Sequence, residues 1–270
     1  MVMSLEVTHD DRGVLVLRLN RAEQRNAIDD ATMLELIAAV EAAGTDDSVR
    51  VIVLEGAGGH FCSGADIVAR NAPSAGGGAD RKARTGSIQR RLPTQAHRLI
   101  PLICTVQVPV VCKVQGWAAG IGFQIALAAD ITMAADDARF WQPFGERGFT
   151  PDSGATWLLP RRVGEVRARE LLLLGRAISG REAADWGAIH RAVTEEELDA
   201  AVDDVVATLA AGPTVALGLT KWLLHASATA ELPAQLANEA FALELSSRTQ
   251  DFREGMAAFR EKRPPRFEGR

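Results

Sequence analysis

Short apolar runs alternate with helical segments along the first two thirds of this 270-residue chain. The runs VRVIVLEG (49–56), VPVVCKVQG (108–116) and ITMAA (131–135) are typical of buried strands. Strands that alternate with helices predict an α/β core in which neighbouring strands pair in parallel. After about residue 195 the pattern is helical throughout, which favours a lid or an assembly surface.

The length suffices for one large core with a small appendage. We expect an α/β core with the functional site over residues 1–200 and a helical oligomerisation and lid region over residues 201–270. LEVTHDDRGVLVLRL (5–19) predicts a β-hairpin. The polar, glycine-rich stretch 71–86 predicts a mobile loop. The next segment, 87–106, is expected to be helical, with Pro101 interrupting the helix.

The composition argues against several classes of partner. The net charge is −5 and no basic stripe is present, so nucleic acid is not an expected partner. The apolar runs are too short to span a bilayer, and the first residues lack the basic and apolar regions of a signal peptide. Cys62, Cys104 and Cys112 have no metal-ligand spacing, so no metal site is expected. Their odd number is typical of reduced thiols, and these features together predict a cytoplasmic protein without a membrane partner.

Two strand-to-helix turns could bind an anionic oxygen through the backbone. CSGADI (62–67) and AAGIGFQIAL (118–127) each place glycine or alanine after an apolar strand, where a helix is expected to begin. The first N–H groups of a helix lack internal partners and lie at the positive end of its dipole. Two such turns facing one point would stabilise a developing negative oxygen. The alternatives are a phosphate loop, whose lysine and hydroxyl residue are absent, and close packing of helix on strand through glycine.

Six motifs occur in an order that resembles one enzyme family. They are LNRAEQRNAID (19–29), FCSGADI (61–67), VQGWAAGIGFQIALAADI (114–131), GFTPDSGATWLLPRRVG (148–164), REAADWGAIHRAV (181–193) and EGMAAFREKRPPRF (254–267). With them the chain resembles the crotonase (enoyl-CoA hydratase/isomerase) superfamily over nearly its whole length. The resemblance implies a crotonase-like spiral of ββα repeats and a C-terminal helical region that builds a homotrimer, alone or as a dimer of trimers. It also implies an acyl-CoA thioester as ligand, with no separate cofactor because coenzyme A is carried by the substrate.

The resemblance further implies roles for particular residues. The backbone N–H groups of Ala65 and Ile121 would hold the thioester oxygen, which makes the adjacent α-proton more acidic and stabilises an enolate. Coenzyme A would bind along the main chain of the first turn and a preceding loop, and two tail residues would reach the ligand of a neighbouring subunit. The implied binding residues are Ala65, Asp66, Ile67 and Val68 in the turn, Arg25 and Ala27 in the loop, and Phe259 and Lys262 in the tail.

The two glutamates that activate water in the family's hydratases are absent. Gln124 and Phe144 occupy their positions, and neither side chain can exchange a proton near neutral pH. Asp152 is the alternative acid: it resembles the acid of dienoyl-CoA isomerases and of the ring-epoxide isomerase of phenylacetate degradation, and the nucleophile of chlorobenzoyl-CoA dehalogenase. An aromatic residue at Phe144 suits a pocket for a ring or a hydrophobic acyl chain. Without the resemblance, an Asp before Ser and Gly is typical of a helix N-cap or a turn.

We therefore expect an acyl-CoA isomerase in which Asp152 moves a proton, and with it a double bond. One alternative is an enoyl-CoA hydratase that uses Glu146 or another acid; others are a dehalogenase-like or hydrolase-like enzyme and a non-catalytic acyl-CoA-binding member. His97 lies at about the place of a histidine in dehalogenase-like members, although a surface or core histidine is the commoner interpretation.

Overall fold

The computed structural model describes residues 3–66 and 85–270, which form a six-stranded and a three-stranded sheet with helices around them. The strands are β1 (Leu5–His9), β2 (Val14–Leu19), β3 (Val51–Gly56), β4 (Val110–Val114), β5 (Trp117–Ala119), β6 (Ile131–Ala135), β7 (Arg139–Trp141), β8 (Ile178–Ser179) and β9 (Arg191–Val193). The α-helices are α1 (Asp30–Ala43), α3 (Ser87–Arg91), α4 (Ala96–Thr105), α5 (Ile121–Ala128), α6 (Ala155–Arg169), α7 (Gly180–Asp185), α8 (Glu195–Ala210), α9 (Thr214–Ser227), α10 (Leu232–Ser246) and α11 (Gln250–Glu261). Shorter helical turns are η1 (Ala22–Gln24), η2 (Leu92–Thr94), η3 (Gly145–Arg147) and η4 (Glu170–Leu174).

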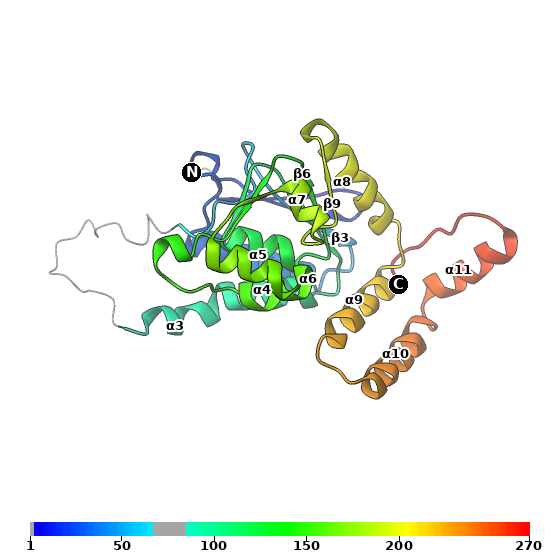
Figure 1. Cartoon of the computed structure of the whole chain (residues 1–270). Coiled ribbons are helices and arrows are strands. Elements are labelled where there is room, and N and C mark those ends of the chain that lie inside the picture. The colour runs from blue at the N-terminus through cyan, green and yellow to red at the C-terminus, as the bar shows by residue number, and fades with distance from the viewer. Residues whose placement is uncertain (1–2, 67–84) are drawn as a thin grey trace.

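The larger sheet is parallel except at one edge, which confirms the predicted α/β class. Its strand order is β1-β2-β3-β4-β6-β9. β1 pairs antiparallel with β2, as the predicted hairpin requires, and the remaining neighbours pair in parallel. β3 is buried along its whole length because elements cover both faces of the sheet. On one side α4, α5 and α6 pack in a row, and α8 packs against β3, β4, β6 and β9 (Figure 1).

The helix that follows the glycine-rich stretch differs from expectation at one proline. Pro93 lies in η2, which separates α3 from α4, but Pro101 lies inside α4 and does not interrupt it. The prediction for Pro101 was wrong because tertiary packing offsets the lost hydrogen bond. The buried face of α4, which includes Leu99, Ile100 and Ile103, holds the helix against the core. Most of the predicted mobile loop and the helix start expected after Asp66 lie outside the described residues.

The C-terminal helices α9, α10 and α11 extend away from the core (Figure 1). Within the described residues, the main hydrophobic cluster contains no residue beyond Ala210, the last residue of α8. Large apolar side chains on the extended helices are instead exposed; they include Leu224, Leu232, Phe241, Leu243 and Phe259. In the chain's described ranges no single helix is long and apolar enough to cross a bilayer, and α8 and α9 reach that length only as a pair bent by 106°.

One ion pair fastens the extended helices to the core. Lys221 on α9 is only 7% exposed, and its ammonium donates to the Asp130 carboxylate (2.7 Å) and to the Val108 carbonyl (3.3 Å). Asp130 also accepts from the Val110 N–H (2.7 Å). Burial lowers the pKa of Lys221 and raises that of Asp130, although each charge favours the ionised form of the other.

We expect Asp130→Asn to destabilise the protein, because it leaves the Lys221 ammonium without its countercharge. Breaking a buried ion pair costs about 3–5 kcal/mol, and partial water contact at Asp130 should place this variant near 3 kcal/mol. Denaturant unfolding measures the change, and the exposed pair of Arg98 and Glu41 provides the control. Glu41→Gln should cost less than about 1 kcal/mol. Equal losses in both variants would contradict the anchoring role.

Candidate active site

The two turns expected to bind an oxyanion lie side by side. Cys62 and Ala118 form a parallel β-bridge between them. In this bridge the Cys62 N–H donates to the Trp117 carbonyl (2.8 Å), and the Ala119 N–H donates to the Cys62 carbonyl (2.9 Å). Each segment turns at a glycine two residues after the bridge, at Gly64 and at Gly120. The two turns therefore begin at matching positions.

The glycines of the two turns lie close together. A Cβ on Gly64 would lie 3.2 Å from the Ala119 carbonyl oxygen, and a Cβ on Gly120 would lie 3.9 Å from the Gly64 Cα. Both glycines have positive φ angles, +110° and +51°, which L side chains rarely adopt. Ala65 and Ile121 follow these glycines directly, so their N–H groups occupy equivalent positions in two neighbouring segments.

The Ala65 N–H is directed away from Ile28. On its other side Ala65 bridges Ile28, whose N–H donates to the Gly64 carbonyl (2.8 Å) and whose carbonyl accepts from the Asp66 N–H (2.9 Å). In a parallel bridge the central residue turns its own N–H away from that partner. No described residue accepts a hydrogen bond from the Ala65 N–H.

Ile121 is the first residue of α5 and supplies the second N–H. The N–H groups of Phe123 and Gln124 donate to the Gly120 carbonyl, whereas that of Ile121 has no acceptor among the described residues. It lies at the positive end of the α5 dipole. All residues of α5 are buried, which fixes the direction of this N–H. The geometry therefore suits an anionic oxygen held between two main-chain donors.

Asp152 is connected to the same helix through Gln124. The Gln124 side chain is fully buried, and its amide donates to the Asp152 carbonyl (3.4 Å) and to the Gln142 side-chain oxygen (3.3 Å). Gln124 lies one turn after Ile121 on α5, so it links the second turn to the main chain of Asp152. The amide oxygen of Gln124 and the amide nitrogen of Gln142 have no protein partner in the described ranges.

The carboxylate of Asp152 does not cap the following helix. The N-cap of α6 is Gly154, and Asp152 contributes only its carbonyl, which accepts from the Ala155 N–H (3.0 Å). The N-cap interpretation was wrong because Ser153 and Gly154 both adopt left-handed conformations (φ +52° and +83°), which moves the cap two residues along. The alternative interpretation, a turn that begins at Asp152, is confirmed by the bond from the Ala155 N–H. The Ser153 hydroxyl donates to the half-buried Asp152 carboxylate (3.0 Å). A strained, buried serine beside an acid is typical of functional sites.

Phe144 and Glu146 have different environments. Phe144 is buried and packs edge-on against Phe149, with 5.5 Å between ring centroids. It lies two residues after Gln142, whose side-chain oxygen accepts from the Gln124 amide. Glu146 is exposed and lies against Gly175, on a different element from Asp152 and with no described contact to it. Glu146 therefore has no described connection to α5, whereas the main chain of Asp152 is bonded to it through Gln124.

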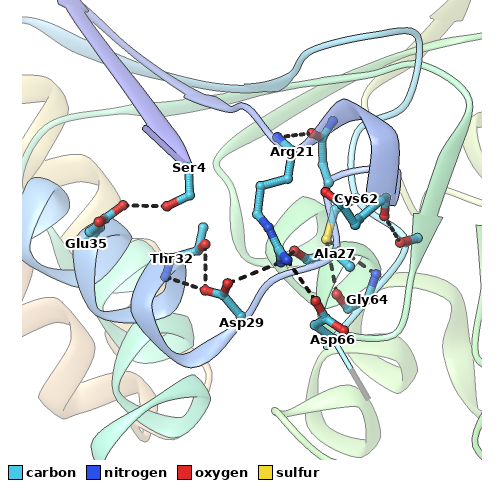
Figure 2. Close-up of polar contacts among 12 residues, drawn as sticks. Ser4, Arg21, Ala27, Asp29, Thr32, Glu35, Cys62, Gly64 and Asp66 are labelled. Carbon is cyan, nitrogen blue, oxygen red and sulfur yellow. Dashed lines mark hydrogen bonds and ion pairs between the residues drawn. The ribbon is translucent and has the colours of Figure 1, made fainter. Parts of the chain in front are cut away.

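The loop expected to bind coenzyme A lies against the first turn (Figure 2). Figure 2 shows Ala27 of the loop beside Gly64 of the turn. The Ser63 N–H donates to the Arg25 carbonyl (3.0 Å), while the Arg25 side chain is exposed. Arg25 and Asn26 both have left-handed φ angles, and the buried Asn26 amide donates to the His60 carbonyl (2.6 Å). Ala27 lies next in this loop and is half-buried. Two further predicted binding residues, Ile67 and Val68, lie outside the described residues.

Three predicted residues are not brought to this site within the single chain. His97 is exposed on α4, one turn before Ile100, which packs near Gly154. Phe259 is 80% exposed at the end of α11, and Lys262 is exposed in the segment that follows it. Arg21, Asn26, Gln142 and Ser153 were not singled out from the sequence.

The cysteine beneath the first turn should be unreactive. Cys62 is fully buried, its sulfur accepts from the Gly64 N–H (3.4 Å), and burial raises the pKa of its thiol to about 12. Cys112 is also fully buried, and burial raises its pKa as well. We expect iodoacetamide at pH 8 to leave both thiols unmodified in the native protein and to label them after denaturation. Peptide mass spectrometry reads the result, and rapid native labelling of Cys62 would contradict this packing.

Comparison with known proteins gives concordant matches. A family model described as Enoyl-CoA hydratase/isomerase matches residues 9–270. A 1,2-epoxyphenylacetyl-CoA isomerase from Escherichia coli (strain K12) is 38% identical over 269 residues, 100% of each chain. A relative named "Probable enoyl-CoA hydratase" from Rhodobacter capsulatus is 40% identical over 258 residues, 96% of this chain and 95% of the relative. The crystal structure of an enoyl-CoA hydratase from Bacillus anthracis superposes with a TM-score of 0.90 at 28% identity, covering 99% of this chain and 100% of that one. The predicted crotonase-like fold is thereby confirmed.

Proposed function

Because the chain belongs to the enoyl-CoA hydratase/isomerase family, we propose that it is an acyl-CoA isomerase that moves a double bond through an enolate. The substrate we propose is an unsaturated acyl-CoA, with an acyl group derived from an aromatic ring as one form. The observation that carries the proposal is the linkage of Asp152, through Gln124, to the helix whose first N–H belongs to Ile121.

The proposed mechanism has two proton transfers. The Asp152 carboxylate removes a proton from a carbon next to the double bond, and the C–H electron pair moves toward the thioester carbonyl. The resulting enolate oxygen accepts hydrogen bonds from the N–H groups of Ala65 and Ile121. Asp152 then returns the proton to a different carbon, the double bond re-forms one position along, and no atom is gained or lost. Each main-chain donor of this kind is worth about 2.7–4 kcal/mol in the transition state.

The environment of the site favours isomerisation over water addition. Gln124 is buried, and its amide cannot act as an acid or base. Phe144, the other position that resembles a hydratase glutamate, is a buried phenyl ring. Asp152 is therefore the one carboxylate that we assign to proton transfer. The similarity to an isomerase of epoxyphenylacetyl-CoA is consistent with a ring-derived acyl group beside Phe144.

Two substrates test this function against its alternatives. We expect conversion of trans-3-hexenoyl-CoA to the 2-enoyl isomer, followed by chromatography, and a rate of water addition to crotonyl-CoA near background. Fast hydration without isomerisation would instead support a hydratase. Single turnover in oxygen-18 water separates the dehalogenase-like and hydrolase-like alternatives, since a nucleophilic Asp152 would retain the label. Binding of both thioesters without conversion would support a non-catalytic member.

We also propose that the chain forms a homotrimer, alone or as a dimer of trimers. The support is the exposed apolar surface of α9, α10 and α11, which lacks any core of its own. Large apolar side chains exposed in such number are typical of a protein interface. Size-exclusion chromatography with light scattering should give the mass of three or six chains. A mass of one chain at micromolar concentration would contradict the proposal.

A further inference from the structure

Arg21 connects the loop at residues 25–29 to the first oxyanion turn. It lies just after β2, and its backbone makes two hydrogen bonds with Asn26. The Arg21 N–H donates to the Asn26 side-chain oxygen, and the Asn26 N–H donates to the Arg21 carbonyl, both at 2.9 Å. Asn26 in turn donates to the carbonyls of Ala57 and His60 (2.8 and 2.6 Å). The position of the Arg21 main chain is therefore fixed independently of the contacts of its guanidinium.

The guanidinium contacts three groups on two segments (Figure 2). One terminal nitrogen donates to the Ala27 carbonyl (2.5 Å) and lies 3.4 Å from the Asp29 carboxylate. The other donates to the Asp66 carboxylate (2.9 Å). The Arg21 side chain is 20% exposed and that of Asp66 is 10% exposed, so solvent screens this pair only in part.

Asp29 is held in the same network. Its carboxylate accepts from the backbone N–H and the hydroxyl of Thr32, both at 2.8 Å, and so caps α1. Burial tends to raise the pKa of Asp29, but the Thr32 donors and the Arg21 guanidinium together hold that pKa below its usual value. Asp29 is therefore charged and fixed at neutral pH, which gives Arg21 an anchor on α1.

Asp66 follows Ala65 directly, so the contacts that hold Asp66 also affect the Ala65 N–H. The direction of the Ala65 N–H depends on the peptide planes around it. The backbone of Asp66 is held by Ile28, and its side chain is held by Arg21. We propose that Arg21 is a positioning residue, which directs the Ala65 N–H at the thioester oxygen by clamping Asp66 to the Ala27 carbonyl. This inference rests on the proposed function insofar as a thioester carbonyl is the ligand of that N–H.

The chemistry requires an arginine. A guanidinium is planar and presents several N–H donors in a fixed fork, so it can contact a carbonyl and a carboxylate on separate segments at once. A lysine ammonium carries the same charge on a flexible stem and cannot match these directions. The conservative change Arg21→Lys should therefore retain the fold but only part of the positioning.

The test uses the full-length protein and [1-13C]butyryl-CoA, a saturated thioester. Two donors on the carbonyl oxygen lower its infrared stretching frequency, so the band reports the oxyanion site without turnover. We expect a clear downshift in the wild-type protein, less than half of that shift in Arg21→Met and in the nearly isosteric Asp66→Asn, and an intermediate shift in Arg21→Lys. The matched control is Arg18→Met, which removes an arginine of β2 that pairs with the buried Glu55, away from the turn.

The outcomes separate this inference from the proposed function. A full downshift in folded Arg21→Met and Asp66→Asn, with a wild-type band that does shift, overturns the role of Arg21 alone. No downshift in the wild-type protein overturns both the oxyanion site and this inference. A loss of stability without a change in the band, as in a purely structural ion pair, also overturns the positioning role; circular dichroism and thermal unfolding of each variant provide that comparison. If Arg21→Met does not fold, Arg21→Lys and Asp66→Asn decide the question.

Discussion

Replacing Asp152 by Asn should lower kcat about 10³–10⁴-fold, near the upper end of what a single general acid–base residue contributes. The loss is expected to be large because we assign both proton transfers to this one carboxylate. Binding of the coenzyme A ester should persist. The amide can still accept from the Ser153 hydroxyl, and the contact with Gln124 uses the main-chain carbonyl of residue 152.

The control for Asp152→Asn is Glu146→Gln, which removes the same charge from an exposed side chain near Gly175. It should leave kcat within about twofold, because an exposed side chain with no part in proton transfer should change the activation free energy by less than ~0.5 kcal/mol. Steady-state rates with trans-3-hexenoyl-CoA and calorimetric binding of butyryl-CoA measure the two effects. Activity of Asp152→Asn at the wild-type level would refute the mechanism.

Gly120→Ala is the second change for which we expect a large effect. Gly120 has φ +51° and ψ −122°, a combination that glycine adopts freely and alanine does not. The nearest atom to an added Cβ is 3.9 Å away, so the methyl fits but the backbone conformation is strained. Relief of that strain would rotate the peptide that carries the Ile121 N–H. Loss of one such donor lowers kcat about 10²–10³-fold.

A matched glycine separates strain from catalysis. Gly164, within α6, has φ +75° and ψ +164°, and nothing lies within 4 Å of an added Cβ. Both substitutions should lower the unfolding temperature, because each places alanine where ~1–3 kcal/mol of backbone strain results. Only Gly120→Ala should lower kcat strongly. Equal kcat losses in the two variants, or a normal kcat in Gly120→Ala, would contradict the assignment of the Ile121 N–H.

Local patterns predicted the parts of the fold that depend on local physics. Alternation and a turn containing Gly13 predicted the hairpin of β1 and β2. Glycine between an apolar strand and an apolar helix predicted both oxyanion turns. The bridge between Cys62 and Ala118 pairs distant segments and was not predicted; only the resemblance to a family implied that the two turns hold one oxygen.

The remaining features depend on contacts between distant segments or on uncommon backbone conformations. Arg21 and Asp66 are 45 residues apart in the chain, and no periodicity connects them. The left-handed conformation of Ser153 moved the cap of α6 away from Asp152, although the sequence there is typical of a cap at Asp152. Pro101 remained inside α4 because the buried face of that helix outweighs a lost hydrogen bond.

The most direct test of the account is deuterium exchange with solvent, catalysed by the wild-type protein and by Asp152→Asn. trans-3-Hexenoyl-CoA is incubated with each protein in D2O, and NMR follows deuterium at the carbon next to the thioester. We predict that the wild-type protein exchanges this proton and shifts the double bond, and that Asp152→Asn binds the ester but does neither. Exchange by Asp152→Asn at the wild-type rate, or no exchange and no isomerisation by the wild-type protein, would contradict the assignment of Asp152.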